Sequence, residues 1–134
     1  MFRIIPNMDY LAIDYGESKV GFALGNDKMA MPLEVFYYQN FDHLLKKINS
    51  IIEEERTKKI IIGLSENTTA EKTKDFAKNL KQNLDQEIIL SDETLSTQDA
   101  KAFAIDAGIK RKKRKQMEDA FAAAIILQNY LDNL

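Results

Sequence analysis

The sequence predicts one α/β domain, built on a five-stranded mixed sheet with helices on both faces. Its first third holds three short apolar runs separated by turn residues, a pattern typical of antiparallel strands. The rest alternates short β-branched runs with amphipathic stretches, which is typical of parallel strands joined by helical crossovers. A chain of 134 residues holds one core. We therefore treat 1–134 as a single domain, with 1–7 as an optional N-terminal extension.

The first two strands are predicted at 9–15 and 19–25, on either side of a turn that contains Gly16. Asp14 stands at the carboxyl end of the first strand. Glycine accepts a positive φ and lets a ligand approach the backbone closely. This stretch suits metal or phosphate chemistry, and it equally suits an ordinary Asp-Gly turn.

A third strand is predicted at 32–38, with Pro32 as its first residue, where proline is tolerated. These three strands would form an antiparallel meander. Leucine and isoleucine then recur at helical spacing over 41–56, which predicts an amphipathic helix. Asp42 is a candidate cap for its N-terminus.

Two further strands are predicted at 59–64 and 87–92, where continuous apolar runs indicate cover on both faces. A helix at 70–84 connects them. Thr68 and Glu71 before and within its first turn fit a capping box.

The last part of the chain predicts helices at 96–107 and 116–132, the first capped by Ser96 and stopped by Gly108. Residues 110–115 between them are six consecutive cations. Such a run is either a solvated loop or a patch that binds phosphates.

The composition excludes several kinds of site. The chain has no cysteine and one histidine, which excludes disulfide scaffolds, thiolate sites and zinc sites that need several imidazoles. A metal here would have carboxylate ligands, which favours magnesium, manganese or calcium. We see no signal peptide or membrane span, so a cytoplasmic protein without a membrane partner is expected. The net charge of −2 gives no overall attraction to nucleic acid, so any attraction must be local.

Three acids are expected to converge at the carboxyl ends of the parallel strands, where ligands collect in such sheets. Asp14 ends the first strand, and either Asp92 or Glu93 ends the last. In the last helix, Asp119 shares a stripe with small and apolar residues that would face the sheet, whereas Glu118 is rotated by about 100°. As ordinary features, these acids would be turn residues or a favourable charge on a helix dipole.

Converging carboxylates favour a divalent cation. Two unit charges about 4 Å apart repel by about 4 kcal/mol near a protein surface, and a cation removes that cost. Carboxylate sites with magnesium or manganese activate water on phosphodiesters. The cluster of cations would bind the phosphates, with Lys19 as a further contact.

Six segments in chain order carry a resemblance to a known family: 12–16 (AIDYG), 19–24 (KVGFAL), 61–64 (IIGL), 92–97 (DETLST), 111–115 (RKKRK), and Asp119 with 122–131 (AAAIILQNYL). Together they resemble the YqgF/RuvX family of pre-16S rRNA nucleases and Holliday junction resolvase-like proteins. The resemblance implies a ribonuclease H-like fold and a nuclease dependent on Mg²⁺ or Mn²⁺ that trims the 5′ end of the 16S rRNA precursor. It also implies Asp14, Glu93 and Asp119 as the catalytic and metal-binding acids, which favours Glu93 over Asp92.

The expected partner is structured RNA or branched DNA, bound by a monomer or a weak homodimer. The expected nucleic-acid contacts are Lys19, Lys110, Arg111, Lys112, Lys113, Arg114 and Lys115. A junction-cleaving DNA nuclease and a non-catalytic RNA-binding module in ribosome assembly or transcription remain alternatives. ATP binding of the sugar kinase and actin type is disfavoured, because it needs two such domains and the chain is too short for both.

Overall fold

The computed structural model describes the backbone of residues 7–65, 68–95 and 110–134, and their side chains except those at 65, 92–95, 111 and 114. The strands are β1 (Tyr10–Asp14), β2 (Lys19–Gly25), β3 (Ala30–Tyr37), β4 (Lys59–Ser65) and β5 (Glu87–Leu95), and the helices are α1 (Phe41–Glu55), α2 (Ala70–Asn83) and α4 (Arg111–Asp132). The helix predicted at 96–107 and the stop at Gly108 lie outside the described residues. None of the described helices has the length and apolar character needed to cross a membrane.

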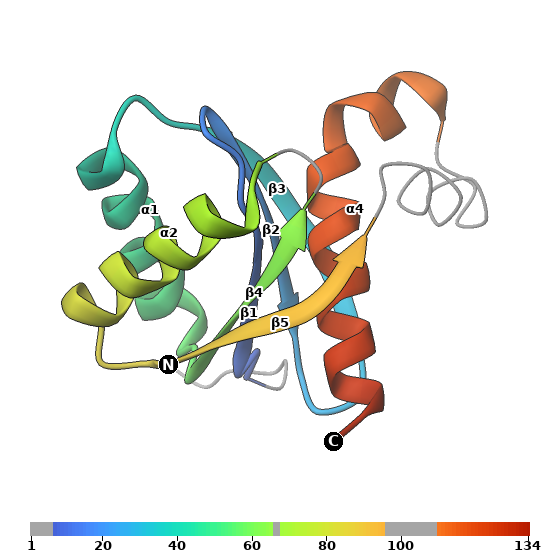
Figure 1. Ribbon diagram of the computed structural model, residues 1–134. Coiled ribbons are helices and arrows are strands. Elements are labelled where there is room, and N and C mark those ends of the chain that lie inside the picture. The colour runs from blue at the N-terminus through green and yellow to red at the C-terminus, as the bar shows by residue number, and fades with distance from the viewer. Residues whose placement is uncertain (1–6, 66–67, 96–109) are drawn as a thin grey trace.

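The strands form one five-stranded sheet in the order β3-β2-β1-β4-β5. Strand β2 runs antiparallel to both β1 and β3, whereas β4 and β5 run parallel to β1. This mixed sheet confirms the predicted architecture. Because parallel strands end at the same edge, the carboxyl ends of β1, β4 and β5 share one rim of the sheet, the upper one in Figure 1.

Helices α1 and α2 cover one face of the sheet, and α4 covers the other (Figure 1). Side chains of β1 alternate between these faces. Leu11 and Ile13 join the core beneath α1 and α2, whereas Tyr10 and Ala12 pack with α4. Asp14 follows Tyr10 and Ala12 in this alternation and therefore belongs to the face covered by α4.

Helix α4 lies close against the sheet because both surfaces carry small residues. Ala123 of the helix is fully buried. A Cβ built on Gly21 of β2 would lie 1.9 Å from the carbonyl oxygen of Asp119, and one built on Gly63 of β4 would lie 2.3 Å from Cδ1 of Ile126. The prediction that this stripe of the last helix faces the sheet is confirmed.

Two predicted helix caps are wrong by one or two residues. Helix α1 is capped by Asn40, whose side-chain oxygen accepts a hydrogen bond from the backbone N–H of His43 at 2.9 Å, and not by Asp42. Helix α2 is capped by Thr69 and not by Thr68. In each case neighbouring residues have similar capping ability, and the path of the chain decides which one is used.

Strand β3 begins at Ala30, so Pro32 lies inside the strand and not at its start. The proline is tolerated because β3 is an edge strand, where one backbone N–H has no ladder partner to lose.

Residues 111–115 of the basic run are helical, so the alternative of a solvated loop is wrong for them. Helix α4 begins at Arg111, five residues before the predicted start at 116. Lysine and arginine are good helix formers, and no glycine or proline interrupts the run. These first turns of α4 extend beyond the carboxyl ends of β4 and β5 (Figure 1).

Candidate active site

Asp14 is the last residue of β1 and is only 2% exposed. Aspartate is seldom so deeply buried unless it serves a specific interaction. Its position on the α4 face, at the shared rim of β1, β4 and β5, favours a functional site over an ordinary solvent-exposed turn.

Asp119 approaches the same place from helix α4 and is 7% exposed, whereas the neighbouring Glu118 is more exposed. Gly21 links the two aspartates. It is the cross-strand partner of Asp14 within the sheet, and its Cα position is in contact with the backbone of Asp119. The two acids therefore lie on either side of one glycine, one in the sheet and one in the helix above it.

Lys19 stands beside Asp119 at the same rim. Its Nζ lies 3.1 Å from Oδ2 of Asp119, and its side chain is 43% exposed. The hydrogen bond to Asp119 raises the pKa of Lys19, so this amine is a permanent cation at neutral pH. The predicted role of Lys19 is thus compatible with its place, because its side chain is partly exposed to solvent.

A cavity of about 370 Å³ opens next to these groups, lined by Gly16, Glu17, Ser18, Lys19 and Asp119. Its volume falls in the range of ligand sites. The turn after β1 forms one wall, and Asp119 of α4 forms another.

The backbone of β5 brings the third predicted acid towards this rim. Gly63 of β4 pairs with both Asp14 and Ser91, and the register then shifts, so that residues 92 and 93 fall in a bulge. Bulges are frequent next to active sites, where they redirect a side chain. The side chains of Asp92 and Glu93 lie outside the described part of the structure, so the choice of Glu93 stays a prediction.

The side chains of four lysines of the basic run are exposed, namely Lys110, Lys112, Lys113 and Lys115, and Arg111 and Arg114 are described in their backbone only. Residues three, four and seven apart share one face of a helix. Lys112 and Lys115 therefore continue the stripe of Asp119 beyond the rim, whereas Lys113 belongs to another face.

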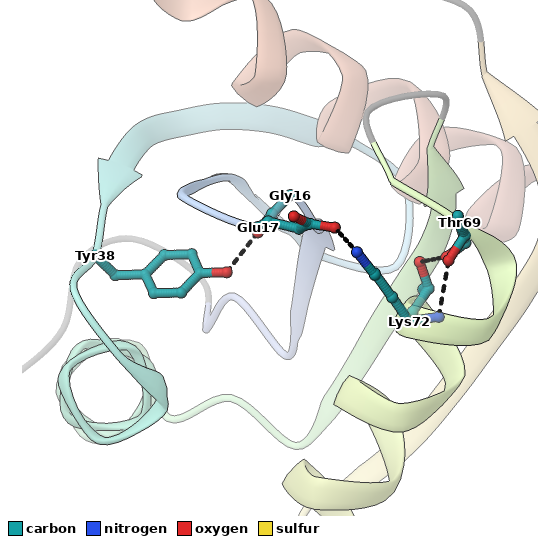
Figure 2. Close-up of polar contacts among 6 residues, drawn as sticks. Gly16, Glu17, Tyr38, Thr69 and Lys72 are labelled. Atoms are coloured by element: carbon teal, nitrogen blue, oxygen red, sulfur yellow. Dashed lines mark hydrogen bonds and ion pairs between the residues drawn. The ribbon is translucent and has the colours of Figure 1, made fainter.

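Two contacts that hold the turn after Asp14 were missed by the sequence analysis. The hydroxyl of Tyr38 donates a hydrogen bond to the carbonyl oxygen of Gly16 at 2.5 Å, and Lys72 forms an ion pair with Glu17 (Figure 2). Each pair is far apart in the chain, by 22 and 55 residues. No local pattern signals such contacts, because only the packing of β3 and α2 around the turn creates them.

The donor atoms at this rim fit a hard divalent cation. Asp14 and Asp119 offer carboxylate oxygens, the ligands that magnesium and manganese prefer. Within the described ranges, no three acidic, histidine or cysteine side chains gather closely enough to hold a metal. A set of three ligands therefore depends on a side chain outside those ranges, such as that of Glu93.

Two solved structures that share this fold were determined in complex with Holliday junctions. Thermus thermophilus RuvC, solved in complex with a Holliday junction, superimposes with a TM-score of 0.54 at 14% identity, covering 92% of this chain and 94% of RuvC. The fowlpox virus resolvase, solved with Holliday junction DNA, gives 0.53 at 12% identity, covering 92% and 97%. These likenesses confirm the ribonuclease H-like fold.

Sequence comparisons give the family. Residues 8–133 match the family model described as "RuvX: Holliday junction resolvase". The "Putative pre-16S rRNA nuclease" of Mycoplasmopsis synoviae is 38% identical over 93% of this chain and 98% of its own length, and that of Rickettsia felis is 36% identical over 98% and 90%. The extent of these matches shows that this chain belongs to the RuvX family of nucleases.

Proposed function

We propose that this protein is a divalent-metal-dependent nuclease that processes the 5′ end of the 16S rRNA precursor in the cytoplasm. The observation that carries the proposal is the pair of buried aspartates, Asp14 and Asp119, on either side of Gly21 at the rim of the sheet. Membership of the RuvX family and the names of the relatives support it.

In this proposal Asp14, Glu93 and Asp119 hold Mg²⁺ or Mn²⁺. When bound, the ion would activate water and stabilise the charge that develops on the scissile phosphate. The protein's own part is to keep the carboxylates ionised and close together, although charges about 4 Å apart repel by about 4 kcal/mol near a surface. Lys19 offsets part of that repulsion at Asp119.

The cations near the rim bind the nucleic-acid backbone in the same proposal. Lys19 and the stripe of Lys112 and Lys115 lie on the side of Asp119, with Lys110, Arg111, Lys113 and Arg114 adding charge to the same turns. Because the chain as a whole carries a net charge of −2, this local concentration supplies the attraction to phosphate.

The direct test titrates Mn²⁺ into wild type, Asp14→Asn and Asp119→Asn, following calorimetric heat and cleavage of a precursor-like RNA. We expect both substitutions to weaken metal binding and to abolish cleavage, while RNA binding persists. Glu118→Gln is the matched control, since it removes one charge from the adjacent residue of the same helix. It should leave metal binding and cleavage near the wild-type values.

Equal metal binding in wild type and Asp14→Asn would contradict the proposed site. RNA binding without cleavage in the wild type, in the presence of either metal, would favour the non-catalytic RNA-binding module instead.

Branched DNA is the second candidate substrate, favoured by the description of the family model. Resolution of a four-way junction needs two active sites. Cleavage of a synthetic junction, together with a stable dimer in sedimentation experiments, would favour this alternative, whereas a monomer or weak homodimer that cleaves only the RNA supports the first proposal.

A further inference from the structure

A second cavity, of about 320 Å³, lies on the opposite side of the turn that follows Asp14. Glu17 lines both this cavity and the one beside Asp119, so the turn is a wall that the two share. The second cavity belongs to the face of the sheet covered by α1 and α2, from which Phe41, Asp75 and Asn79 line it.

Aromatic rings form much of the second cavity. Tyr15 stacks on Phe76 with ring centroids 4.2 Å apart, and Phe41 meets Phe76 edge to face at 6.4 Å. Tyr15, Tyr38 and Phe41 are only partly buried, so these rings retain surface towards the cavity. The hydrogen bond from Tyr38 to Gly16 fixes one ring against the shared wall (Figure 2).

The polar groups of this cavity suit a base more than a phosphate. Glu17 and Asp75 supply two carboxylates against the single ammonium of Lys72. Carboxylates repel phosphate but accept hydrogen bonds from the exocyclic amino group of a base, as they do with cytosine. Asn79, one turn after Asp75 on α2, adds an amide that both donates and accepts.

We propose that the second cavity binds one unpaired nucleobase, preferably one with an amino group, from the strand that passes the acid site. Unstacked bases are recognised in this way, by stacking on aromatic rings and by hydrogen bonds to their edges. The exposed ion pair of Lys72 with Glu17 is weak, so Lys72 can turn to the neighbouring phosphate as the base enters. The inference rests on the proposed function for the presence of nucleic acid, but not on cleavage.

The test compares three RNA hairpins in binding experiments with EDTA, where no metal-dependent cleavage occurs. One hairpin has a blunt end, one carries an unpaired cytidine tail, and one carries an abasic tail with the same phosphates. We expect the wild type to bind the cytidine tail at least about fivefold more tightly than the abasic tail, the lower end of what stacking of one base contributes.

Tryptophan substitutions on α2 supply a matched pair of variants. Asn79 and Asn83 are both exposed and lie four residues apart on the helix, but only Asn79 lines the cavity. Asn79→Trp should fill the cavity and remove the preference for cytidine, whereas Asn83→Trp should keep it. Thermal melting checks that both variants fold, and in the wild type, amide NMR shifts on adding cytidine monophosphate should appear at Asn40 and Asn79.

Equal affinity of the wild type for cytidine and abasic tails would overturn the inference, as would a preference that survives in a folded Asn79→Trp variant. Cleavage is measured separately with Mg²⁺ or Mn²⁺. A cytidine preference in a protein that cleaves nothing would contradict the proposed function but support base binding in the second cavity.

Discussion

Tyr38 shows how a single side chain fixes the geometry of the candidate site. Its hydroxyl donates to the carbonyl oxygen of Gly16, two residues after Asp14. The hydrogen bond joins the end of β3 to the turn that separates the two cavities. A contact of this kind contributes about 1 kcal/mol to stability. It also restrains the path of the chain directly after Asp14.

We expect Tyr38→Phe to lower the free energy of unfolding by about 1 kcal/mol at pH 7, because the carbonyl of Gly16 loses its donor. Tyr37→Phe is the control, since Tyr37 is the adjacent tyrosine and is 69% exposed. Urea denaturation of both variants measures the difference. Equal stability of the two variants would show that the hydrogen bond contributes nothing.

The stabilities of the same two variants should depend differently on pH. Burial is the main cause that raises the pKa of Tyr38 above its ordinary value of 10.0. Above about pH 10 the unfolded chain releases this proton while the folded protein retains it, so stability falls as the pH rises through that range. Tyr38→Phe should lose part of this alkaline decline, whereas Tyr37→Phe should retain it.

Among the elements, α4 does most to assemble the site, and its closeness to the sheet depends on glycine. Gly21→Ala would place a methyl group 1.9 Å from the backbone carbonyl of Asp119. Gly25→Ala would instead meet a side-chain atom, Cδ2 of Leu127, at 2.7 Å.

We expect Gly21→Ala to destabilise the protein by about 3 kcal/mol or more, at the upper end of overpacking costs, because a helix backbone cannot move aside cheaply. Gly25→Ala should cost less, since Leu127 can change rotamer. Denaturant midpoints give the comparison. The reverse order of stabilities would mean that α4 is not held against β2 at Asp119.

The exposed lysines in the first turns of α4 should contribute unequally to RNA binding. Lys112 and Lys115 share the face of Asp119, whereas Lys113 does not. Each phosphate contact contributes about 0.7 to 0.9 to the slope of log affinity against log salt. We expect Lys112→Gln and Lys115→Gln each to reduce this slope for RNA by nearly one contact, while Lys113→Gln changes it little. Equal slopes in all three variants would mean that the run attracts RNA without a preferred face.

At the scale of the whole molecule, the rim assembles only when sheet and helix are folded together, so a metal bound there should stabilise the fold. A ligand at about 100 times its dissociation constant adds about 2.7 kcal/mol. At about 3 °C per kcal/mol for a domain of this size, saturating Mn²⁺ should raise the melting temperature of the wild type by about 8 °C. Asp14→Asn and Asp119→Asn should each lose most of that shift, and Glu118→Gln should keep it. A shift of the same size in all four proteins would place the metal elsewhere.

The sequence determined the architecture because the local pattern of apolar residues indicates each strand and helix. Alternating and continuous apolar runs gave all five strands, and helical spacing gave α1, α2 and the face of α4 that carries Asp119. Right-handed crossovers then required β4 and β5 to run parallel to β1. From that topology it followed that Asp14 and the end of β5 share one rim.

Only the tertiary structure decided what depends on neighbours distant in the chain. The contact of Gly21 with Asp119 and the hydrogen bond of Tyr38 to Gly16 arise where elements meet, and the caps at Asn40 and Thr69 depend on the path by which the chain enters each helix. The helical state of the basic run could be predicted only in part. Lysine and arginine favour a helix, but a run of like charges is also typical of a solvated loop. Local patterns record which face of an element is buried, whereas the distance between two side chains on different elements is set by the packing of everything between them.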